Sequence, residues 1–180
     1  MYVLVMIGVA WVLWFIPFFR KRTGSSPAQT TDSRARWGIG LQILGYSLLW
    51  QGKFWVAPVQ LWQLALGIVF FALAILLSWS GRSALGRHWR IDAGLDADHQ
   101  LVTSGPYRFV RHPIYASMLC IFLATGVLVA PWWLFAPATV LFLAGTEIRV
   151  RIEDRLLSSR FGEASSEYRS RVKAYIPLLR

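Results

Sequence analysis

The sequence predicts an all-α integral membrane protein, a bundle of about five transmembrane helices with a loop on one side and amphipathic helices at the C-terminus. Hydrophobic residues make up 56% of the 180 residues and charged residues only 16%, a composition that a soluble globule explains poorly. Several apolar runs approach the roughly 20 residues that a helix needs to cross a bilayer. Basic residues concentrate between these runs. The length suits one membrane domain over residues 1–180.

Residues 1–79 are expected to form three N-terminal spans. The first covers Met1 to Phe19, with no Lys or Arg before it and Arg20-Lys21-Arg22 directly after it. A cleaved signal peptide would carry its basic residues first and a small-residue cleavage site later. This run is therefore interpreted as a retained span whose N-terminus lies outside. The turn-rich polar stretch from Thr23 to Arg36 is expected to be a mobile cytoplasmic linker.

The second and third spans are expected at Trp37 to about Val56 and at Leu61 to Trp79. Gln51, Gly52 and Lys53 lie near the outer end of the second span and weaken its pattern. A lysine at this depth can extend its ammonium group to the membrane interface. Both runs are therefore interpreted as membrane helices.

Residues 80–180 are expected to hold a cofactor-binding loop, a helical hairpin and the C-terminal helices. The polar connection from Ser80 to Arg111 mixes Asp with Arg and contains four glycines, which argues against a single regular element. A connection of this length in a compact domain is usually functional or disordered. The mixture of opposite charges favours a folded, functional loop.

The fourth and fifth spans are expected at Ile114–Ala130 and Leu134–Thr146. Because only three residues link them, the two helices must be antiparallel neighbours. From Glu147 onward, charged and apolar residues alternate at helical spacing, so the helix is expected to leave the membrane as an amphipathic helix. Phe161-Gly162 is expected to end it, before a last amphipathic turn or two.

The distribution of positive charge predicts the orientation of the bundle. In the five-span arrangement Lys53 alone of the 19 Lys and Arg residues lies outside, as the positive-inside rule requires. The loop and the C-terminus are therefore expected to be cytoplasmic. Membrane orientation also accounts for the formal charge of +10. Nucleic acid is not expected as a partner, because its binding needs a basic face on a soluble fold.

Metal and disulfide chemistry are not expected. Cys120 is the only cysteine and lies in an apolar run, so an intrachain disulfide is impossible and packing is its expected role. The three histidines show no H-x-x-x-H spacing and have no cysteine nearby, which disfavours a metal site. His88 is interpreted as an interfacial or loop residue without a chemical role. The fingerprints of soluble nucleotide-binding folds are also absent.

The polar segment Asp98–Tyr115 is the candidate functional site. It holds two His, two Arg and two Tyr residues directly before the apolar run that begins with Pro113, and proline suits the first position of a helix. Free backbone N–H groups at such a helix start favour an anionic group. Arg149 and Glu153 share one helix face and are expected beside His112, because the hairpin makes the two helix ends neighbours.

This group of residues suits a ligand with several kinds of functional group. A carboxylate can hold an ammonium group, aromatic faces can hold a flat base or a cation, and helix N-terminal amides can hold a carboxylate. S-adenosylmethionine carries an amino acid, an adenine and a sulfonium. It is therefore a plausible ligand, though not a unique one.

Several motifs resemble those of the isoprenylcysteine carboxyl methyltransferase family and its bacterial relatives. They are His99-x-Leu101-Val102-Thr103-x-Gly105-x-Tyr107, Arg111-His112-Pro113-x-Tyr115, Arg149-x-x-x-Glu153-Asp154, Phe161-Gly162 and Tyr168. The resemblance covers about Trp79 to Pro177 and does not extend to the first three spans. One departure is Glu153-Asp154, where the family usually has two adjacent glutamates.

The resemblance implies an integral membrane methyltransferase that uses S-adenosylmethionine and releases S-adenosylhomocysteine. Its acceptor would be lipophilic or membrane-embedded: the carboxylate of a prenylcysteine-like group, or a small thiol, amine or lipid. Arg149 would lie on the acceptor side, near the reacting group, and is the candidate catalytic residue. The positions that match the cofactor-binding residues of the family are His99, Gln100, Leu101, Val102, Tyr107, His112, Pro113, Ile114, Tyr115 and Glu153.

Two other functions are compatible with parts of the sequence. A membrane reductase that uses NADPH is one, because sterol-reductase-like proteins share a similar Arg-His-Pro-x-Tyr helix start. The late Arg149/Glu153 pair with Phe161-Gly162 favours the methyltransferase. The other is a structural or lipid-binding bundle, which leaves the convergence of Tyr107, His112 and Glu153 unexplained.

Overall fold

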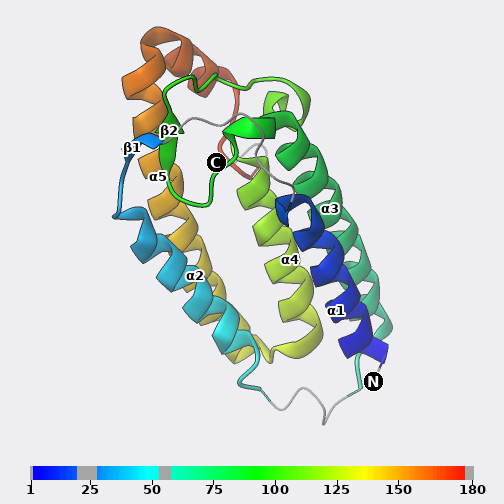
Figure 1. Cartoon of the computed structure of the whole chain (residues 1–180). Coiled ribbons are helices and arrows are strands. Elements are labelled where there is room, and N and C mark those ends of the chain that lie inside the picture. Colours follow the sequence, from blue (N-terminus) through cyan, green and yellow to red (C-terminus); the bar gives the residue numbers. More distant parts are fainter. Residues whose placement is uncertain (1, 20–27, 53–57, 177–180) are drawn as a thin grey trace.

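The computed structural model describes residues 2–19, 28–52 and 58–176. Within these ranges the chain forms an elongated helical bundle (Figure 1), and the expected all-α membrane bundle is confirmed. The described residues contain five α-helices: α1 (Tyr2–Phe15), α2 (Ala35–Leu49), α3 (Leu61–Leu85), α4 (Pro113–Val129) and α5 (Trp132–Arg171). They also contain three short 3₁₀ helices: η1 (Ile16–Phe19), η2 (Gly86–His88) and η3 (Gly105–Arg108).

An α-helix overlaps each of the five stretches expected to span the membrane, but among the described residues α2 is neither long nor apolar enough to be a candidate span. Among the described residues, Tyr2–Phe19, Leu61–His88 and Trp132–Arg171 are long and apolar enough to cross a bilayer, and α4 is a shorter apolar helix. Helix α2 is shorter than expected: its helical turns end at Leu49, just before the Gln51-Gly52 pair. The expected end of that span near Val56 lies outside the described residues. The chain is an integral membrane protein.

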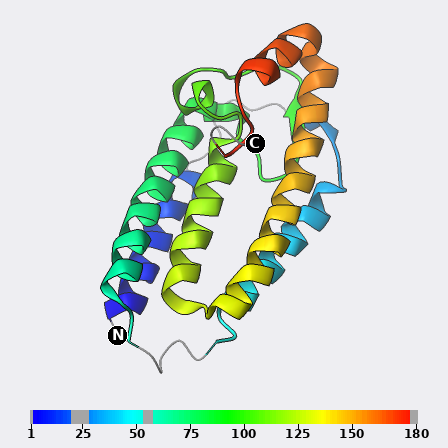
Figure 2. The same ribbon diagram turned by 180° about the vertical axis from the view of Figure 1, so that it is seen from behind.

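Helix α4 lies between the other helices (Figures 1 and 2). Its Phe122 ring stacks on Phe142 of α5 with ring centroids 4.5 Å apart, and Tyr46 of α2 meets Phe122 edge-on at 5.2 Å. On the α1 side, the Trp14 indole donates a hydrogen bond to Ser117 Oγ at 3.1 Å. Packing of this kind on several faces fixes the start of α4, where the polar segment lies.

Glycines allow α2 and α5 to approach closely. A Cβ atom at Gly45 would lie 2.9 Å from the carbonyl oxygen of Ala138, and one at Gly145 would lie 2.5 Å from the carbonyl oxygen of Gly38. Small residues let helix backbones pack against each other in membranes, where little hydrophobic force brings helices together. The α2–α5 contact therefore depends on these glycines.

Gly45→Ala is expected to lower the thermal unfolding midpoint. The added methyl group would meet backbone atoms that cannot move aside. Overpacking of this kind lowers the free energy of unfolding by about 1–3 kcal/mol, and each kcal/mol lowers the unfolding midpoint by about 2–4 °C. Gly40→Ala in the same helix is the matched control, because no atom lies within 4 Å of its added Cβ. Alanine is the better helix former, so Gly40→Ala should preserve or raise the midpoint. Equal midpoints for the two variants would contradict the close approach.

Connecting segments gather at the end of the bundle that carries η2 and η3, here called the loop end (top of Figure 1). Strand β1 (Ala28–Thr31) pairs there with β2 (Gly94–Asp96) in an antiparallel ribbon. The expectation of a mobile linker over residues 23–36 was wrong for the described part of that range, because it holds β1 and the start of α2. The reason is a pairing partner more than sixty residues away, which local sequence patterns do not reveal.

The C-terminal segment folds back onto the loop end. Gly162 has φ 51° and ψ −121° and interrupts α5, so the expected helix break at Phe161-Gly162 is observed, although helical structure resumes and continues to Arg171. Beyond it, the backbone N–H groups of Arg111 and His112 donate to the carbonyls of Lys173 and Ala174, at 2.8 and 2.7 Å. These bonds attach the end of the described chain to the start of α4.

Candidate active site

The start of α4 presents its polar residues to the charged part of α5. His112 precedes the helix, and Pro113 takes its first position, where the missing N–H of proline costs no hydrogen bond. Arg149, Glu153 and Asp154 follow the apolar part of α5 at the same end of the bundle. The structure thus brings together the residues that were predicted to be neighbours because α4 and α5 form a helical hairpin.

Polar groups of three residues surround the Glu153 carboxylate. The Tyr115 hydroxyl donates a hydrogen bond to Glu153 Oε1, His112 Nδ1 lies 3.5 Å from Glu153 Oε2, and Arg149 Nη2 lies 3.8 Å from Oε1. The Glu153 side chain is 27% exposed, whereas His112 is 6% exposed. Because the Glu153 carboxylate is partly exposed, it can still accept a hydrogen bond from a ligand.

Arg149 is held by two further hydrogen bonds. Its Nε donates to the Tyr115 hydroxyl oxygen at 2.7 Å, and its Nη2 donates to the carbonyl of Ile91 at 2.7 Å. The first bond joins α5 to α4, and the second joins α5 to the loop before β2. Because the guanidinium is planar and always charged, these bonds fix a cation at a defined place in the site.

Asp154, whose role the sequence left open, holds the other side of His112. Its Oδ1 lies 3.0 Å from His112 Nε2, and its Oδ2 accepts a bond from Arg111 Nη2 at 2.9 Å. Asp154 is 4% exposed and lies in the cavity wall beside His112. It positions His112 through this contact.

The acidic neighbours of His112 favour its charged form. Burial opposes protonation of the ring, but hydrogen bonds with Asp154 and Glu153 outweigh burial and raise the pKa of His112 above its ordinary value of 6.5. The folded protein therefore binds this proton more tightly than the unfolded chain does. By linkage, the stabilisation is complete below about pH 6.5 and is lost as the pH rises through the raised pKa.

This linkage predicts a pH-dependent difference between the wild type and His112→Asn. The thermal midpoint of the wild type, measured without ligand, should exceed that of the variant most at pH 6. The difference should shrink as the pH is raised toward 9, because His112 loses its proton. A difference that stays constant across this range would contradict a protonated His112 in the folded protein.

A cavity of about 350 Å³ opens beside these side chains. Nine of the ten expected cofactor-binding residues line it, as does Arg149; the tenth, Pro113, does not. The Pro113 ring instead packs toward α3, where a Cβ at Gly81 would lie 3.3 Å from Pro113 Cγ. Pro113 therefore contributes the helix start and not a cavity wall. The nine lining residues are His99, Gln100, Leu101, Val102, Tyr107, His112, Ile114, Tyr115 and Glu153.

Burial favours the uncharged forms of the His99 and Tyr107 rings. Burial and then repulsion from His88 lower the pKa of His99 to about 4. Burial also raises the pKa of Tyr107 well above its ordinary value, so the phenol keeps its proton. The Tyr168 hydroxyl donates to the backbone carbonyl of Tyr107, which fixes this residue from the C-terminal side.

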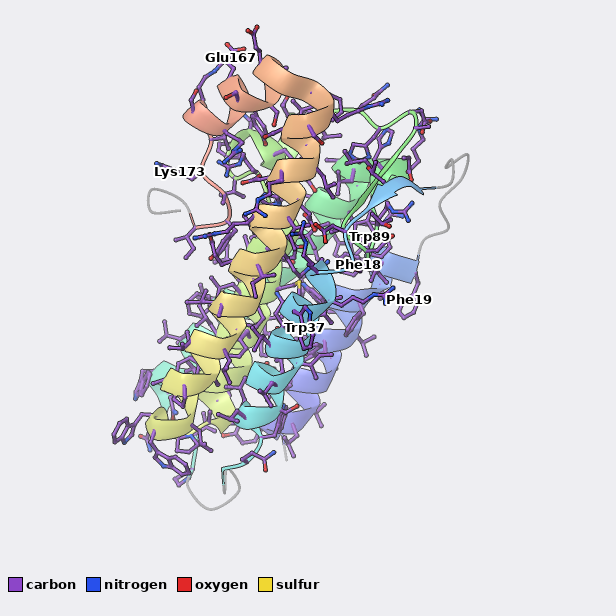
Figure 3. All side chains as sticks on the ribbon, turned by 90° about the vertical axis from the view of Figure 1, so that its left-hand side faces the viewer. Phe18, Phe19, Trp37, Trp89, Glu167 and Lys173 are labelled. Carbon is purple, nitrogen blue, oxygen red and sulfur yellow. The ribbon has the colours of Figure 1, made fainter. Side chains whose placement is uncertain are left out.

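Helices α1 and α2 supply cavity residues that the sequence analysis missed. Trp14 and Phe18 reach the cavity from the N-terminal helix and η1, and Ile39 and Gln42 reach it from α2. Phe18 lies against Trp89 of the loop, with ring centroids 5.3 Å apart (Figure 3). Gln42 carries the one signal that could have been noticed, an amide within an apolar run; its Nε2 donates to Thr146 Oγ1 at 2.9 Å.

The fold and the cavity define an integral membrane protein with a ligand-sized pocket at one end of its helical bundle. Residues 62–164, more than half of the chain, match the phospholipid methyltransferase family. The chain belongs to this family. The resemblance to the isoprenylcysteine methyltransferases is also confirmed, because relatives of that name match the chain.

Three curated relatives illustrate the range of similarity. The cobalt-zinc-cadmium resistance protein CzcN of Cupriavidus metallidurans is 32% identical over 130 residues, which are 72% of this chain and 54% of CzcN. Protein-S-isoprenylcysteine O-methyltransferase B of Arabidopsis thaliana is 30% identical over 127 residues, 70% of this chain and 61% of that protein. Methanethiol S-methyltransferase 1 of Bradyrhizobium diazoefficiens is 37% identical over 71 residues, 39% of this chain and 24% of that protein. The chain spans about half the length of the first of these relatives.

Proposed function

We propose that the protein is an enzyme that transfers a methyl group from S-adenosylmethionine to a lipophilic or membrane-embedded acceptor. The observation that carries this proposal is the convergence of Tyr115, His112 and Arg149 on one partly exposed carboxylate, Glu153, in the wall of the cavity. Relatives named as methyltransferases support the reaction class.

The chemistry of the cavity suits the groups of the methyl donor. Glu153 would accept a hydrogen bond from the donor's ammonium group. The backbone and side chains of Gln100, Leu101 and Val102 would hold the adenine, and Tyr107 and Tyr115 offer aromatic faces near the sulfonium. Arg149 would hold the acceptor. When bound, S-adenosylmethionine supplies the methyl group: a bond forms between the acceptor atom and the methyl carbon as the methyl–sulfur bond breaks, and S-adenosylhomocysteine is left.

The protein would contribute mainly orientation and exclusion of water. A reacting atom held about 3–3.5 Å from its partner gains much of its rate from positioning. A carboxylate acceptor already has a free electron pair, so Arg149 would only need to hold it by its charge. A thiol acceptor would have to lose a proton to solvent or to a neighbouring base. Relatives named for both kinds of acceptor match this chain.

The apolar side of the cavity supports an acceptor that arrives through the bilayer. Trp14, Phe18, Ile39 and Met118 line this side and come from α1, η1, α2 and α4. The N-terminal end of α1 lies at the opposite end of the bundle from the cavity (Figure 1). Together with the positive-inside rule, this arrangement supports an N-terminus outside and a cytoplasmic loop end. A water-soluble donor and a lipophilic acceptor would then meet at the membrane surface.

Isothermal titration of the purified protein with S-adenosylhomocysteine tests the donor, with NADPH as the comparison. Binding of S-adenosylhomocysteine without binding of NADPH is expected. Binding of NADPH alone would replace the methyltransferase with a reductase. Transfer of radiolabelled methyl groups into lipid, prenylcysteine and thiol pools then identifies the acceptor, and no transfer into any pool by a donor-binding protein would contradict these acceptor classes.

A further inference from the structure

Three side chains at the loop end form a group that adjoins the proposed methyl-transfer centre, and two of them, His88 and His99, also line the cavity. They are His88 at the end of η2, Asp96 at the end of β2 and His99, which follows β2. One ligand atom from each residue, a ring nitrogen or a carboxylate oxygen, lies within 4.8 Å of the other two. The sequence does not reveal this group, because His88 precedes β2 in the chain and His99 follows it.

Two ring nitrogens in this group lack a hydrogen-bond partner. Among the described residues, Nδ1 of His88 and Nδ1 of His99 are buried polar atoms without one. His88 is 8% exposed, and the two rings meet edge-on with centroids 5.0 Å apart. A buried polar atom without a partner costs about 1–3 kcal/mol. Two such nitrogens on neighbouring rings, each with a lone pair or an N–H left over, indicate that a partner for the two rings is missing.

The third member of the group supplies negative charge. Asp96 is 1% exposed and pairs with Arg90 Nη1 at 2.7 Å. Arg90 is also bound to Asp92, at 2.7 Å, so two carboxylates share a single guanidinium. Asp96 thus places a carboxylate oxygen beside the two imidazoles. A hydrogen-bonded carboxylate is also the usual state of a metal ligand.

We propose that His88, Asp96 and His99 bind one divalent transition-metal ion of the zinc class. Two imidazole nitrogens and one carboxylate oxygen are a ligand set that Zn²⁺ accepts, with a fourth position left for water or a ligand. Imidazole disfavours Mg²⁺ and Ca²⁺, which prefer oxygen ligands. Metal–ligand bonds of about 2.0–2.2 Å would bring the ligand atoms to roughly 3.3 Å from one another, so rotation of the side chains must shorten their separations by up to about 1.5 Å.

The ion would have a structural effect on the cavity. It would tie the end of η2 to the turn after β2, where the backbone N–H of His99 already donates to the Asp96 carbonyl at 3.1 Å. The next residues, Gln100 to Val102, line the cavity. A bound ion would therefore hold this cavity wall in place without taking part in the methyl transfer. The inference does not rest on the proposed reaction, and metal content can be measured without it.

The test uses the full-length protein in detergent, without a histidine tag and stripped of metal by a chelator. Titration with Zn²⁺ and inductively coupled plasma mass spectrometry should give one ion per chain. Co²⁺ should give the visible absorption of a four-coordinate site with nitrogen and oxygen ligands. X-ray absorption of the Zn²⁺ form should show scattering from two imidazoles and no sulfur. This spectrum tests the site in the wild type, even where a variant fails to fold.

Variants assign the ligands. His88→Gln and Asp96→Asn should each weaken Zn²⁺ binding by at least tenfold, whereas Glu167→Gln, which removes an exposed carboxylate that pairs with Arg171, should retain it. Wild-type protein that binds no Zn²⁺ at micromolar concentrations, or equal loss of Zn²⁺ in a folded Glu167→Gln protein, would overturn the proposal. Titration of the metal-free wild type with S-adenosylhomocysteine reports on the donor site separately, so the failure of one proposal is distinguishable from the failure of the other.

Discussion

Glu153→Gln is expected to weaken the binding of S-adenosylhomocysteine by about 100-fold. The substitution keeps the size of the side chain and removes its charge, so the donor's ammonium group loses an ionic partner and Arg149 loses a neighbouring anion. Loss of one member of a buried, hydrogen-bonded charge pair costs about 2–5 kcal/mol, and tenfold in affinity corresponds to about 1.4 kcal/mol. Isothermal titration of the two proteins at the same pH and salt concentration measures the change.

Glu167→Gln is the matched control for this measurement. Glu167 lies in the same helix beyond the Gly162 break, is 67% exposed and pairs only with the equally exposed Arg171 among the ion pairs of the described residues (Figure 3). Exposed pairs of this kind contribute about 0–1 kcal/mol, so this variant should bind as the wild type does. Unchanged affinity in a folded Glu153→Gln protein would remove Glu153 from the donor site and, with it, the main support for the proposed function.

The sequence was sufficient to predict the helices and the meeting of α4 with α5. Long apolar runs separated by polar segments indicate membrane helices, and a short connection makes two helices antiparallel neighbours. In the structure α4 nevertheless packs mainly on α3, and α5 mainly on α2. Because the positions of His112 and Glu153 relative to that connection are known from the sequence, their proximity follows from geometry. The structure places Nδ1 of His112 3.5 Å from the Glu153 carboxylate.

The sequence could not predict contacts that depend on segments far apart in the chain. Periodicity identifies the inner face of a helix but not the neighbour that it meets, so the role of Trp14 and Gln42 in the cavity wall was not visible. The grouping of His88 with His99 depends in the same way on the β1–β2 pairing. The sequence also left the role of Asp154 open, because its contacts with Arg111 and His112 depend on the way the start of α4 meets α5.

These observations divide the site into a fixed part and an open part. Asp154 and Arg111 are bonded to each other, and the backbone of residues 173 and 174 holds the start of α4. Asp154 and Arg111 line the cavity together with Glu153 and Arg149, but their own bonds hold the start of α4 in place. A rigid support of this kind keeps reacting groups within the small tolerance that positional catalysis requires. Substitutions in the framework should act through stability, and substitutions in the open part through binding and rate.

Arg149→Lys is expected to lower the rate of methyl transfer by about 100- to 1,000-fold. Lysine keeps the positive charge but has a single ammonium group, which cannot reproduce the two bonds that Arg149 makes to Tyr115 and Ile91. The cation would then lie away from the acceptor, and loss of one correctly placed donor in an active site typically costs about 10²–10³ in kcat. Single-turnover transfer of a labelled methyl group, at saturating donor, measures this step.

Arg151→Lys separates the role of Arg149 from a general need for charge. Arg151 lies two residues further along α5, is 65% exposed and pairs with Glu147 on the helix surface. Its replacement should leave the transfer rate within about twofold of the wild type, because the exposed pair contributes little. The Arg149→Lys protein should still bind S-adenosylhomocysteine within about tenfold of the wild type, since Glu153 is retained. If the rate stays unchanged, or if donor affinity falls as far as the rate does, then Arg149 serves the donor or the fold and does not position the acceptor.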